Sequence, residues 1–323
     1  MTSSVLVTGG AGYIGSHLVH LLNTTGVNIV VLDNMTNPSN LDRSGVTFYE
    51  GDIREKSAVS FILRRHQVDR VFHFASKISV GDSVKDPLSY YDDLAGTLSL
   101  LDCMRKNEVR KIVFSSSAAV FGNSGHSYLK TYDHKSPASP YGRMKSMTED
   151  VLVDCASAYG IGSVSLRYFN AAGAHPDGIL GERHDPETHL IPLLLRSILT
   201  GETVTIYGDD YSTPDGTCIR DYVHVCDLAQ AHLLAMYGLD RNPDSAHFFN
   251  LGSGEGYSVF QVIAAITRLT GKSPKVEIGP RRPGDPDRLV ADSSHANQTL
   301  GWKRMYNLDQ IIQHAWNFEK TKS

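Results

Sequence analysis

The stretch Val5-Leu6-Val7-Thr8-Gly9-Gly10-Ala11-Gly12-Tyr13-Ile14-Gly15 decides the fold, because a β-branched strand leads through closely spaced glycines into a segment with helical periodicity. Glycines allow the backbone to turn sharply and to approach a pyrophosphate, which the free N–H groups at the helix N-terminus bind. Asp33 ends the next apolar run, eighteen residues after Gly15. A carboxylate at that point accepts hydrogen bonds from ribose hydroxyls and repels a 2′-phosphate. The stretch therefore predicts a dinucleotide-binding unit that prefers NAD to NADP.

The first half of the chain alternates between short apolar runs and segments of helical periodicity. Continuous apolar strands separated by helices indicate a parallel sheet that helices cover on both faces. The sequence therefore predicts an α/β fold with a Rossmann-type doubly wound parallel sheet, in which ligands bind at the carboxyl ends of the strands. The expected strands are residues 5–7, 29–32, 70–74 and 111–114, and the expected helices are 16–22, 57–66 and 97–107.

The pattern loosens after about residue 170, where Gly, Pro, His and Asp crowd the stretch 174–187. We expect residues 1–175 to form the NAD-binding Rossmann domain, with segments near 222–251 returning to it. Residues 176–323 are expected to form mainly a smaller α/β C-terminal substrate domain.

Composition limits the class of protein. The 323 residues are 41% hydrophobic and 20% charged, which is typical of a globular chain. The net charge of −4 offers no basic field for nucleic acid, no apolar run reaches the length of a membrane span, and the N-terminus lacks a signal-peptide pattern. The four cysteines form no CxxC pair and the fourteen histidines form no HExxH motif, so we expect reduced thiols, no protein-bound metal and a cytoplasmic location.

Tyr141 and Lys145 lie four residues apart on a predicted helix that begins at Ser139-Pro140, so their side chains point the same way. A phenol is a poor base at neutral pH, but a nearby ammonium and a cationic nicotinamide stabilise the phenolate. Such a phenolate accepts a hydroxyl proton while hydride leaves to NAD. The run Ser115-Ser116-Ser117 follows the fourth predicted strand, where a hydroxyl can bridge the substrate oxygen and the tyrosine.

These motifs together resemble the extended short-chain dehydrogenase/reductase superfamily and, within it, the UDP-glucose 4-epimerase family. The resemblance covers nearly the whole chain. The more specific motifs lie in the second half: Arg167-Tyr168-Phe169-Asn170-Ala171-Ala172-Gly173-Ala174, Thr188-His189-Leu190-Ile191-Pro192, Thr213-Pro214-Asp215-Gly216-Thr217-Cys218-Ile219-Arg220-Asp221-Tyr222 and Arg282-Pro283-Gly284-Asp285.

The resemblance implies roles for individual residues. Ser117, Tyr141 and Lys145 would be catalytic. The cofactor NAD would contact Gly9, Gly12, Tyr13, Ile14, Gly15, Asp33, Asn34, Asp52, Ile53, Phe74, Ala75, Ser76, Tyr141, Lys145 and Phe169. The UDP-hexose would contact Ser117, Tyr141, Asn170, His189, Leu190, Ile206, Tyr207, Arg220, Arg282, Asp285 and Leu289.

Two departures from the family pattern concern the grip on the cofactor. The family usually has a lysine where this chain has Ile78, and Lys77 lies one residue earlier. The family also tends to place an asparagine pair after Tyr-Tyr-Asp, whereas this chain reads Tyr90-Tyr91-Asp92-Asp93-Leu94.

The expected reaction is interconversion of UDP-glucose and UDP-galactose by transient oxidation at sugar carbon 4, with NAD retained. UDP-GlcNAc/UDP-GalNAc remain alternative substrates, since Leu289 is intermediate between an open and a restrictive residue. UDP-glucuronate is a further alternative, because the sequence does not identify a cation that would bind its 6-carboxylate. A net dehydrogenase or reductase and an inactive binding module are further alternatives. A dehydratase is disfavoured, because Ala118-Ala119 stands where those enzymes carry Asp-Glu. The resemblance also implies a homodimer formed through helices around 92–107 and 140–158.

Overall fold

The computed structural model describes residues 3–38, 41–123, 125–126, 128–282 and 285–322. Its centre is a seven-stranded, wholly parallel sheet in the order β10-β6-β5-β4-β1-β2-β3. The chain runs from β1 outward to β3 and then crosses back to β4, so the strand order reverses between β1 and β4. Ligands bind beside such a reversal in doubly wound sheets. The strands are β1 (Ser4–Thr8), β2 (Asn28–Asp33), β3 (Val46–Glu50), β4 (Val68–His73), β5 (Lys111–Ser117), β6 (Gly162–Tyr168) and β10 (Ala246–Leu251).

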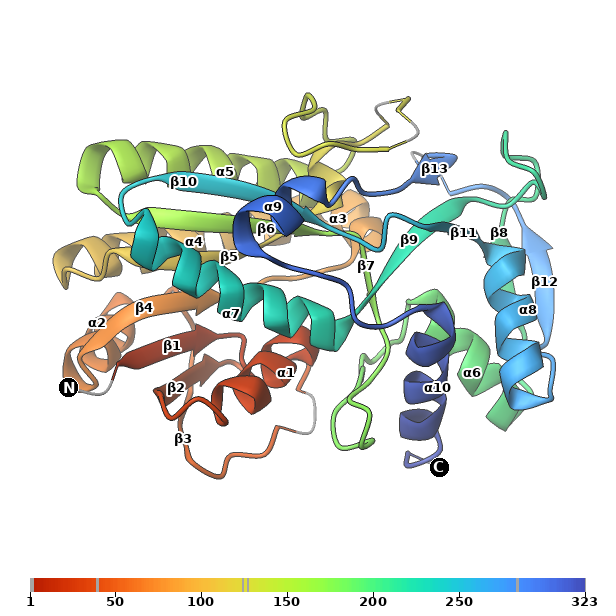
Figure 1. Cartoon of the computed structure of the whole chain (residues 1–323), viewed down its shortest axis with the longest axis horizontal. Helices are drawn as coiled ribbons and strands as arrows, with labels where there is room; N and C mark the ends of the chain where they lie inside the picture. The colour runs from red at the N-terminus through yellow and green to blue at the C-terminus, as the bar shows by residue number, and fades with distance from the viewer. Residues whose placement is uncertain (1–2, 39–40, 124, 127, 283–284, 323) are drawn as a thin grey trace.

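Helices cover both faces of this sheet (Figure 1). Successive side chains of a strand point to opposite faces, so Val5 and Val7 join one hydrophobic core while Leu6 joins the other. The first core includes residues of α1 (Tyr13–Leu22), α7 (Val225–Arg241) and α9 (Ser294–Leu300). The second includes residues of α2 (Lys56–Arg65), α4 (Pro87–Lys106) and α5 (Pro140–Tyr159). The Rossmann-type prediction is therefore confirmed.

Helix boundaries follow local chemistry. The Ser139 side chain accepts a hydrogen bond from the Gly142 N–H and Pro140 occupies the first turn, so α5 begins where the sequence predicts. The prediction for α4 was too short, because this helix begins at Pro87, ten residues before the expected start at residue 97. Its first half packs through Tyr90, Tyr91 and Leu94 against Tyr141 and Met144 of α5.

The chain returns to the first sheet after building part of the C-terminal unit. Strand β10 pairs in parallel with β6, and α7 packs against α1. The edge of the main sheet is thus supplied by residues 246–251 (Figure 1).

The C-terminal unit contains two small sheets and a third hydrophobic core. One sheet consists of strands β7 (Asn170–Ala172), β9 (Ile219–His224), β11 (Gly256–Ser258) and β13 (Arg288–Leu289). Strands β8 (Val204–Tyr207) and β12 (Val276–Gly279) form the other. The core lies among α6 (Leu190–Thr200), α8 (Val259–Thr270) and α10 (Leu308–Glu319). The remaining helices are the short α3 (Val80–Lys85) and the 3₁₀ turn η1 (Ala118–Val120).

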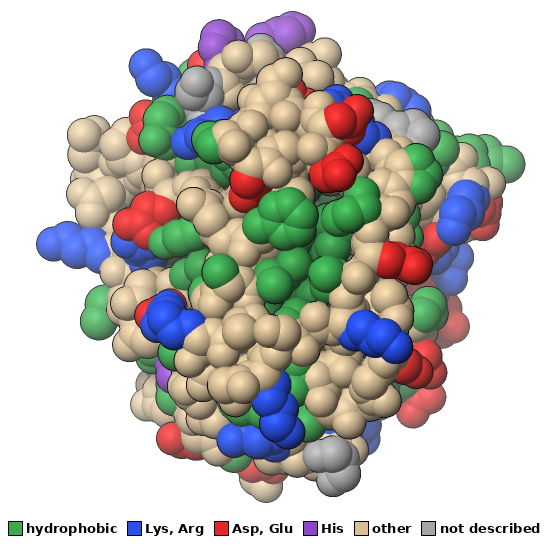
Figure 2. Space-filling view, turned by 90° about the vertical axis from the view of Figure 1, so that its right-hand side faces the viewer, with side chains coloured by type: hydrophobic (Ala, Val, Ile, Leu, Met, Phe, Trp, Pro, Cys, Tyr) green, Lys and Arg blue, Asp and Glu red, His purple; other side chains and the backbone are tan. Residues whose placement is uncertain are grey.

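Figure 2 looks onto the C-terminal unit and shows hydrophobic side chains gathered around a hollow near the centre of this face. A groove of about 530 Å³ lies between α8 and α10 and is lined by Tyr257, Ala265 and Leu308 among others. None of the predicted site residues lines this groove. Among the described residues, no helix has the length and apolar character needed to cross a membrane.

Candidate active site

The glycine loop between β1 and α1 has no room for larger residues. A Cβ at Gly15 would lie 2.3 Å from the Gly9 carbonyl oxygen, and one at Gly9 would lie 2.5 Å from the Ala75 nitrogen. Gly9 also has a φ of +72°, a conformation that side chains rarely adopt. Gly12 is the N-cap of α1 without a side-chain cap, so the first N–H groups of α1 have no capping side chain. This packing produces the bare helix N-terminus that a pyrophosphate requires.

Asp33 lies at the carboxyl end of β2, beside this loop, and is 8% exposed. Its two carboxylate oxygens accept hydrogen bonds from the Ala11 N–H at 2.9 Å and the Met35 N–H at 2.8 Å. These bonds fix the carboxylate and leave further lone pairs for ribose hydroxyls. Asn34 follows with an exposed side chain that accepts a hydrogen bond from the Thr36 hydroxyl.

Other predicted cofactor residues lie on the loops that follow β3 and β4. Asp52 is paired with Arg54, whose hydrogen bonds lower the pKa of this carboxyl group. Ile53 is buried in the second core, and the N–H groups of Phe74 and Ala75 both donate to the Thr8 carbonyl oxygen. The predicted residues of β1, β2 and β4 thus line one edge of the sheet. Ser76 follows directly, and Tyr13 spans to the C-terminal unit through a hydrogen bond from its hydroxyl to the Gly173 carbonyl oxygen.

Tyr141, Ser117 and Lys145 meet at the carboxyl end of β5. Ser117 is the last residue of β5, and Tyr141 lies in the first turn of α5. Burial raises the pKa of Tyr141, whereas a hydrogen bond with the Ser117 side chain acts in the opposite direction. The Lys145 Nζ lies 5.7 Å from the centre of the Tyr141 ring and donates a hydrogen bond to the Ser115 carbonyl oxygen at 2.9 Å.

The ammonium group of Lys145 is shielded from water, since the residue is 2% exposed. Burial lowers its pKa to about 8, although the charges of Asp93 and Glu149 act to raise it. Desolvation disfavours the protonated form, whereas nearby carboxylates favour it. Lys145 is therefore charged at pH 7 at a cost to the folded state.

The two departures from the family pattern meet in the structure. The Asp93 carboxylate accepts hydrogen bonds from the Lys77 N–H at 2.6 Å and the Ser76 hydroxyl at 3.2 Å. The Lys77 Nζ instead donates to the Ser89 carbonyl oxygen at the start of α4, and Ile78 is 44% exposed. Asp93 therefore holds the loop after β4 through its backbone, while the Lys77 ammonium group is engaged by α4.

The structure adds two buried polar groups that the sequence did not indicate. His73 links Thr8 at 2.7 Å to Thr97 at 2.9 Å, and burial lowers the pKa of its imidazole to about 3, so the ring is neutral. Glu149 binds Arg167 through two hydrogen bonds of 2.8 and 2.7 Å. Their partners come from distant parts of the chain, and local spacing therefore gave no signal.

On the C-terminal side, residues far apart in the sequence form a polar cluster. The Arg220 guanidinium lies 3.0 Å from the Asp285 carboxylate, and the Arg282 guanidinium lies 4.0 Å from the centre of the Tyr207 ring. Leu289 pairs with Arg220 in the β13–β9 ladder. Two cations beside an exposed aromatic ring and a carboxylate match the needs of a pyrophosphate, a base and a ribose.

Four other predicted site residues lie outside this polar cluster. Asn170 belongs to β7 and pairs with Tyr222 of β9, and Phe169 packs in a small core with Leu289. Leu190 is the first residue of α6. The side chain of Ile206 is buried in the core of the C-terminal unit.

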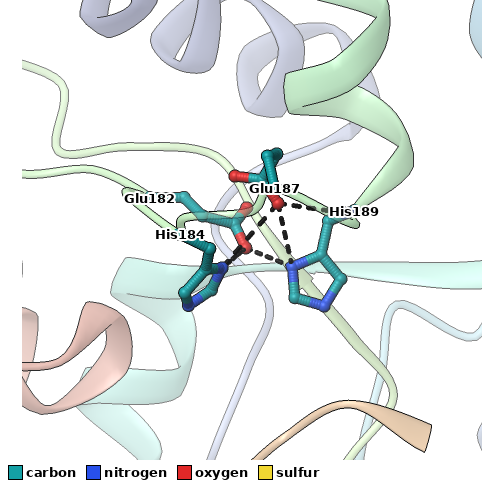
Figure 3. A group of neighbouring side chains, drawn as sticks. All are labelled: Glu182, His184, Glu187 and His189. Carbon is teal, nitrogen blue, oxygen red and sulfur yellow. Dashed lines mark hydrogen bonds and ion pairs between the residues drawn. The ribbon is translucent and has the colours of Figure 1, made fainter. Parts of the chain in front are cut away.

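The Nδ1 atom of His189, a predicted substrate contact, faces the Glu182 carboxylate (Figure 3). His184 and Glu187 complete this cluster. The spacing Glu182-x-His184-x-x-Glu187-x-His189 matches none of the standard metal motifs, such as HExxH.

Comparisons with known proteins identify the family of this chain. The model of the NAD dependent epimerase/dehydratase family matches residues 5–252. A UDP-glucose 4-epimerase of Halalkalibacterium halodurans is 48% identical over 320 residues, which cover 98% of this chain and 96% of the relative.

Two solved structures extend the similarity to the fold. The UDP-glucose 4-epimerase of Brucella ovis in complex with NAD is 43% identical, with a TM-score of 0.93 over 98% of this chain and 99% of that one. The enzyme of Bifidobacterium longum in complex with NAD+ and UDP is 38% identical, with a TM-score of 0.93 over 99% of this chain and 98% of that one. The chain therefore belongs to the NAD-dependent epimerase/dehydratase family, and its relatives there are UDP-glucose 4-epimerases.

Proposed function

We propose that this chain is a UDP-glucose 4-epimerase that interconverts UDP-glucose and UDP-galactose with a retained NAD. The observation that carries the proposal is the meeting of Tyr141, Ser117 and Lys145 at the carboxyl end of β5. The glycine loop lies at the same edge of the parallel sheet, and the Arg220–Asp285 cluster extends from the C-terminal unit.

The residues of the first unit fit NAD. A Cβ at Gly9 or Gly15 would collide with neighbouring backbone, so only glycine permits the tight loop that brings free N–H groups to a pyrophosphate, and the buried Asp33 carboxylate suits the ribose hydroxyls. The proposed set of NAD contacts is completed by Gly12, Tyr13, Ile14, Asn34, Asp52, Ile53, Phe74, Ala75, Ser76 and Phe169. When bound, NAD accepts and returns the hydride of sugar carbon 4.

Tyr141 is the proposed acid–base residue. Its phenolate takes the proton of the sugar 4-hydroxyl and gives it back after the sugar has turned over. The Lys145 ammonium group stabilises the phenolate by its charge, and the Ser117 hydroxyl holds both the phenol and the substrate oxygen. The charge on Lys145 is needed because burial by itself raises the pKa of Tyr141.

The UDP group is proposed to bind the C-terminal cluster. Arg220 and Arg282 neutralise the pyrophosphate, Tyr207 flanks the uracil, and Asp285 accepts hydrogen bonds from the ribose. Asn170, His189, Leu190, Ile206 and Leu289 are proposed to border the nucleotide and sugar. The 4-keto sugar must rotate so that both of its faces can be presented to the same nicotinamide. This rotation requires firm contacts to UDP and loose contacts to the sugar.

We infer two functional units, in which residues 1–175 with segments near 222–251 hold NAD and residues 176–323 mainly hold the UDP-sugar. We also infer a cytoplasmic homodimer formed through α4 and α5. Leu98 of α4 and Met147 and Val153 of α5 are each more than 40% exposed, which is a large apolar area for two neighbouring helices. All four cysteines are free.

The function is tested by incubating the purified chain with UDP-galactose and separating the sugar nucleotides by chromatography. We expect UDP-glucose to form without net NADH. Tyr141→Phe should lower kcat by about 10²–10⁴-fold, whereas the control Tyr132→Phe, on a tyrosine that is 77% exposed, should not. Unchanged turnover in Tyr141→Phe would refute the assignment, and accumulation of NADH would identify a dehydrogenase instead.

The same assay with UDP-GalNAc measures the sugar preference. Leu289 lies beside Arg220 and packs near Phe169, so a larger side chain there would narrow the space for an N-acetyl group. Leu289→Tyr is expected to reduce turnover of UDP-GalNAc more than turnover of UDP-galactose. An equal effect on the two substrates would remove Leu289 from the determinants of specificity.

A further inference from the structure

The loop between β7 and α6 brings together four side chains that the proposed reaction does not use as a group. Each side chain offers one potential ligand atom, and these four atoms, from Glu182, His184, Glu187 and His189, all lie within 4.8 Å of one another. Figure 3 shows the two imidazole rings flanking the two carboxylates.

The separations of these atoms match the size of a metal site. Glu182 Oε1 lies 3.0 Å from His184 Nδ1 and is hydrogen-bonded to His189 Nδ1. Glu187 Oε1 lies 3.8 Å from each of the two Nδ1 atoms. In a tetrahedral zinc site with bonds of about 2.0–2.1 Å, ligand atoms are roughly 3.3–3.4 Å apart. The observed distances lie on both sides of that value.

Burial leaves part of the cluster without partners. The Glu187 side chain is fully buried, and its Oε1 accepts hydrogen bonds from the N–H groups of Thr188 and His189. Among the described residues, its Oε2 has no hydrogen-bond partner, and His184 Nδ1 forms no aligned hydrogen bond. A buried imidazole nitrogen without an aligned partner is costly, and a cation in the centre of the cluster would supply one for His184 Nδ1.

We propose that Glu182, His184, Glu187 and His189 form a structural site for a divalent transition-metal ion of the zinc type. Two imidazole nitrogens and two carboxylate oxygens suit zinc, whereas Mg²⁺ and Ca²⁺ prefer oxygen ligands throughout. The two carboxylates balance the double positive charge when both imidazoles are neutral. Four protein ligands close the coordination sphere, which is the pattern of a structural rather than a catalytic site.

The ion would connect three parts of the molecule. His189 is the N-cap of α6, and Leu190 is the first residue of that helix. The His184 ring packs edge-on against the ring of Tyr13, which follows the glycine loop, with centroids 6.4 Å apart. The Glu182 carbonyl oxygen accepts a hydrogen bond from Lys322 near the C-terminus. Metal binding would thus fix the start of α6. Its effect on UDP binding rests on the proposed function, whereas metal binding itself does not.

Metal binding is tested on the full chain, without a histidine tag, after dialysis against a chelator. Titration with ZnCl2 in a calorimeter is expected to show one ion per chain. Glu187→Gln should lower the affinity at least tenfold. The control is His175→Asn, which removes one imidazole from a different histidine pair, His20 and His175, whose ring centroids are 4.7 Å apart. This variant should leave the affinity unchanged. No stoichiometric binding, or equal affinity in Glu187→Gln, would overturn the proposal.

Two further measurements use the wild-type chain, so their results do not depend on whether a variant folds. Co²⁺ bound to the wild-type chain should give the intense visible absorption of a tetrahedral complex, and the pale spectrum of the aqueous ion would overturn the site. Removal of the metal should raise the KM for UDP-galactose more than it lowers kcat. If zinc binds but the KM stays constant, the positioning role is wrong although the site stands.

Discussion

Replacing Lys145 with Met is expected to stabilise the NAD-free protein at pH 7 while it destroys activity. The pKa of Lys145 is lowered from 10.5 to about 8 by burial. At about 1.36 kcal/mol for each pH unit, keeping the proton on Lys145 at pH 7 costs the folded protein roughly 3 kcal/mol relative to the unfolded chain. Loss of the hydrogen bond from Nζ to the Ser115 carbonyl oxygen offsets about 1 kcal/mol of the gain. The net gain is about 2 kcal/mol.

The pH dependence of this gain has a definite sign. Between pH 8 and 10.5 the lysine proton is bound to a larger fraction of unfolded chains than of folded ones. The stability of the wild type therefore rises with pH across that window, and the advantage of Lys145→Met falls to near zero by about pH 9.5.

Thermal unfolding of the NAD-free proteins measures the effect. For a unit of about 200 residues, 2 kcal/mol corresponds to a rise in Tm of roughly 4 °C at pH 7. Lys85→Met, on a side chain that is 80% exposed, is the matched control and should change Tm by less than about 1 °C. A Tm difference that does not vary with pH, or a less stable Lys145→Met protein at pH 7, would refute the reasoning. The same variant should lose at least about 10²-fold in kcat.

Two further predictions concern packing. Gly15→Ala places a Cβ 2.3 Å from the Gly9 carbonyl oxygen and should abolish the co-purification of NAD, measured by absorbance after denaturation, whereas Gly81→Ala, with open space around its Cβ, should retain NAD fully. Arg167→Met removes the doubly hydrogen-bonded partner of the fully buried Glu149 and should destabilise the protein by about 3–5 kcal/mol in thermal unfolding. A loss below about 1 kcal/mol would show that Glu149 takes up a proton or that its remaining partners Lys135, at 3.5 Å, and Ser116 suffice.

Features that depend on residues close together in the sequence could be predicted from it, whereas contacts between distant residues could not. The glycine loop and the Tyr141/Lys145 pair depend on neighbours within one strand–loop–helix unit or one helical turn, and their local structure is as predicted. The fold class was also predictable, because buried parallel strands leave long apolar runs. The ion pair between Arg220 and Asp285 was not predictable from spacing, since β9 and the loop before β13 meet only in the folded chain. Resemblance to a family supplied those residues instead.

The Glu182–His189 cluster shows a different limit. Its four residues lie within eight positions, but the loop has no periodicity that would show which side chains converge. The early start of α4 was missed for a related reason, because Tyr90, Tyr91 and Leu94 meet Tyr141 and Met144 of α5 only in the folded chain.

The late position of β10 has a consequence for biosynthesis. Strand β6 is complete once residue 168 has left the ribosome, but its outer edge acquires a partner only when residues 246–251 emerge. During the intervening translation, the growing chain presents an open strand edge to other nascent chains, and such edges promote aggregation. A ribosome that stalls between these two points would therefore hold a Rossmann sheet that cannot close its edge, and chaperones that shield β6 would be most effective in this interval.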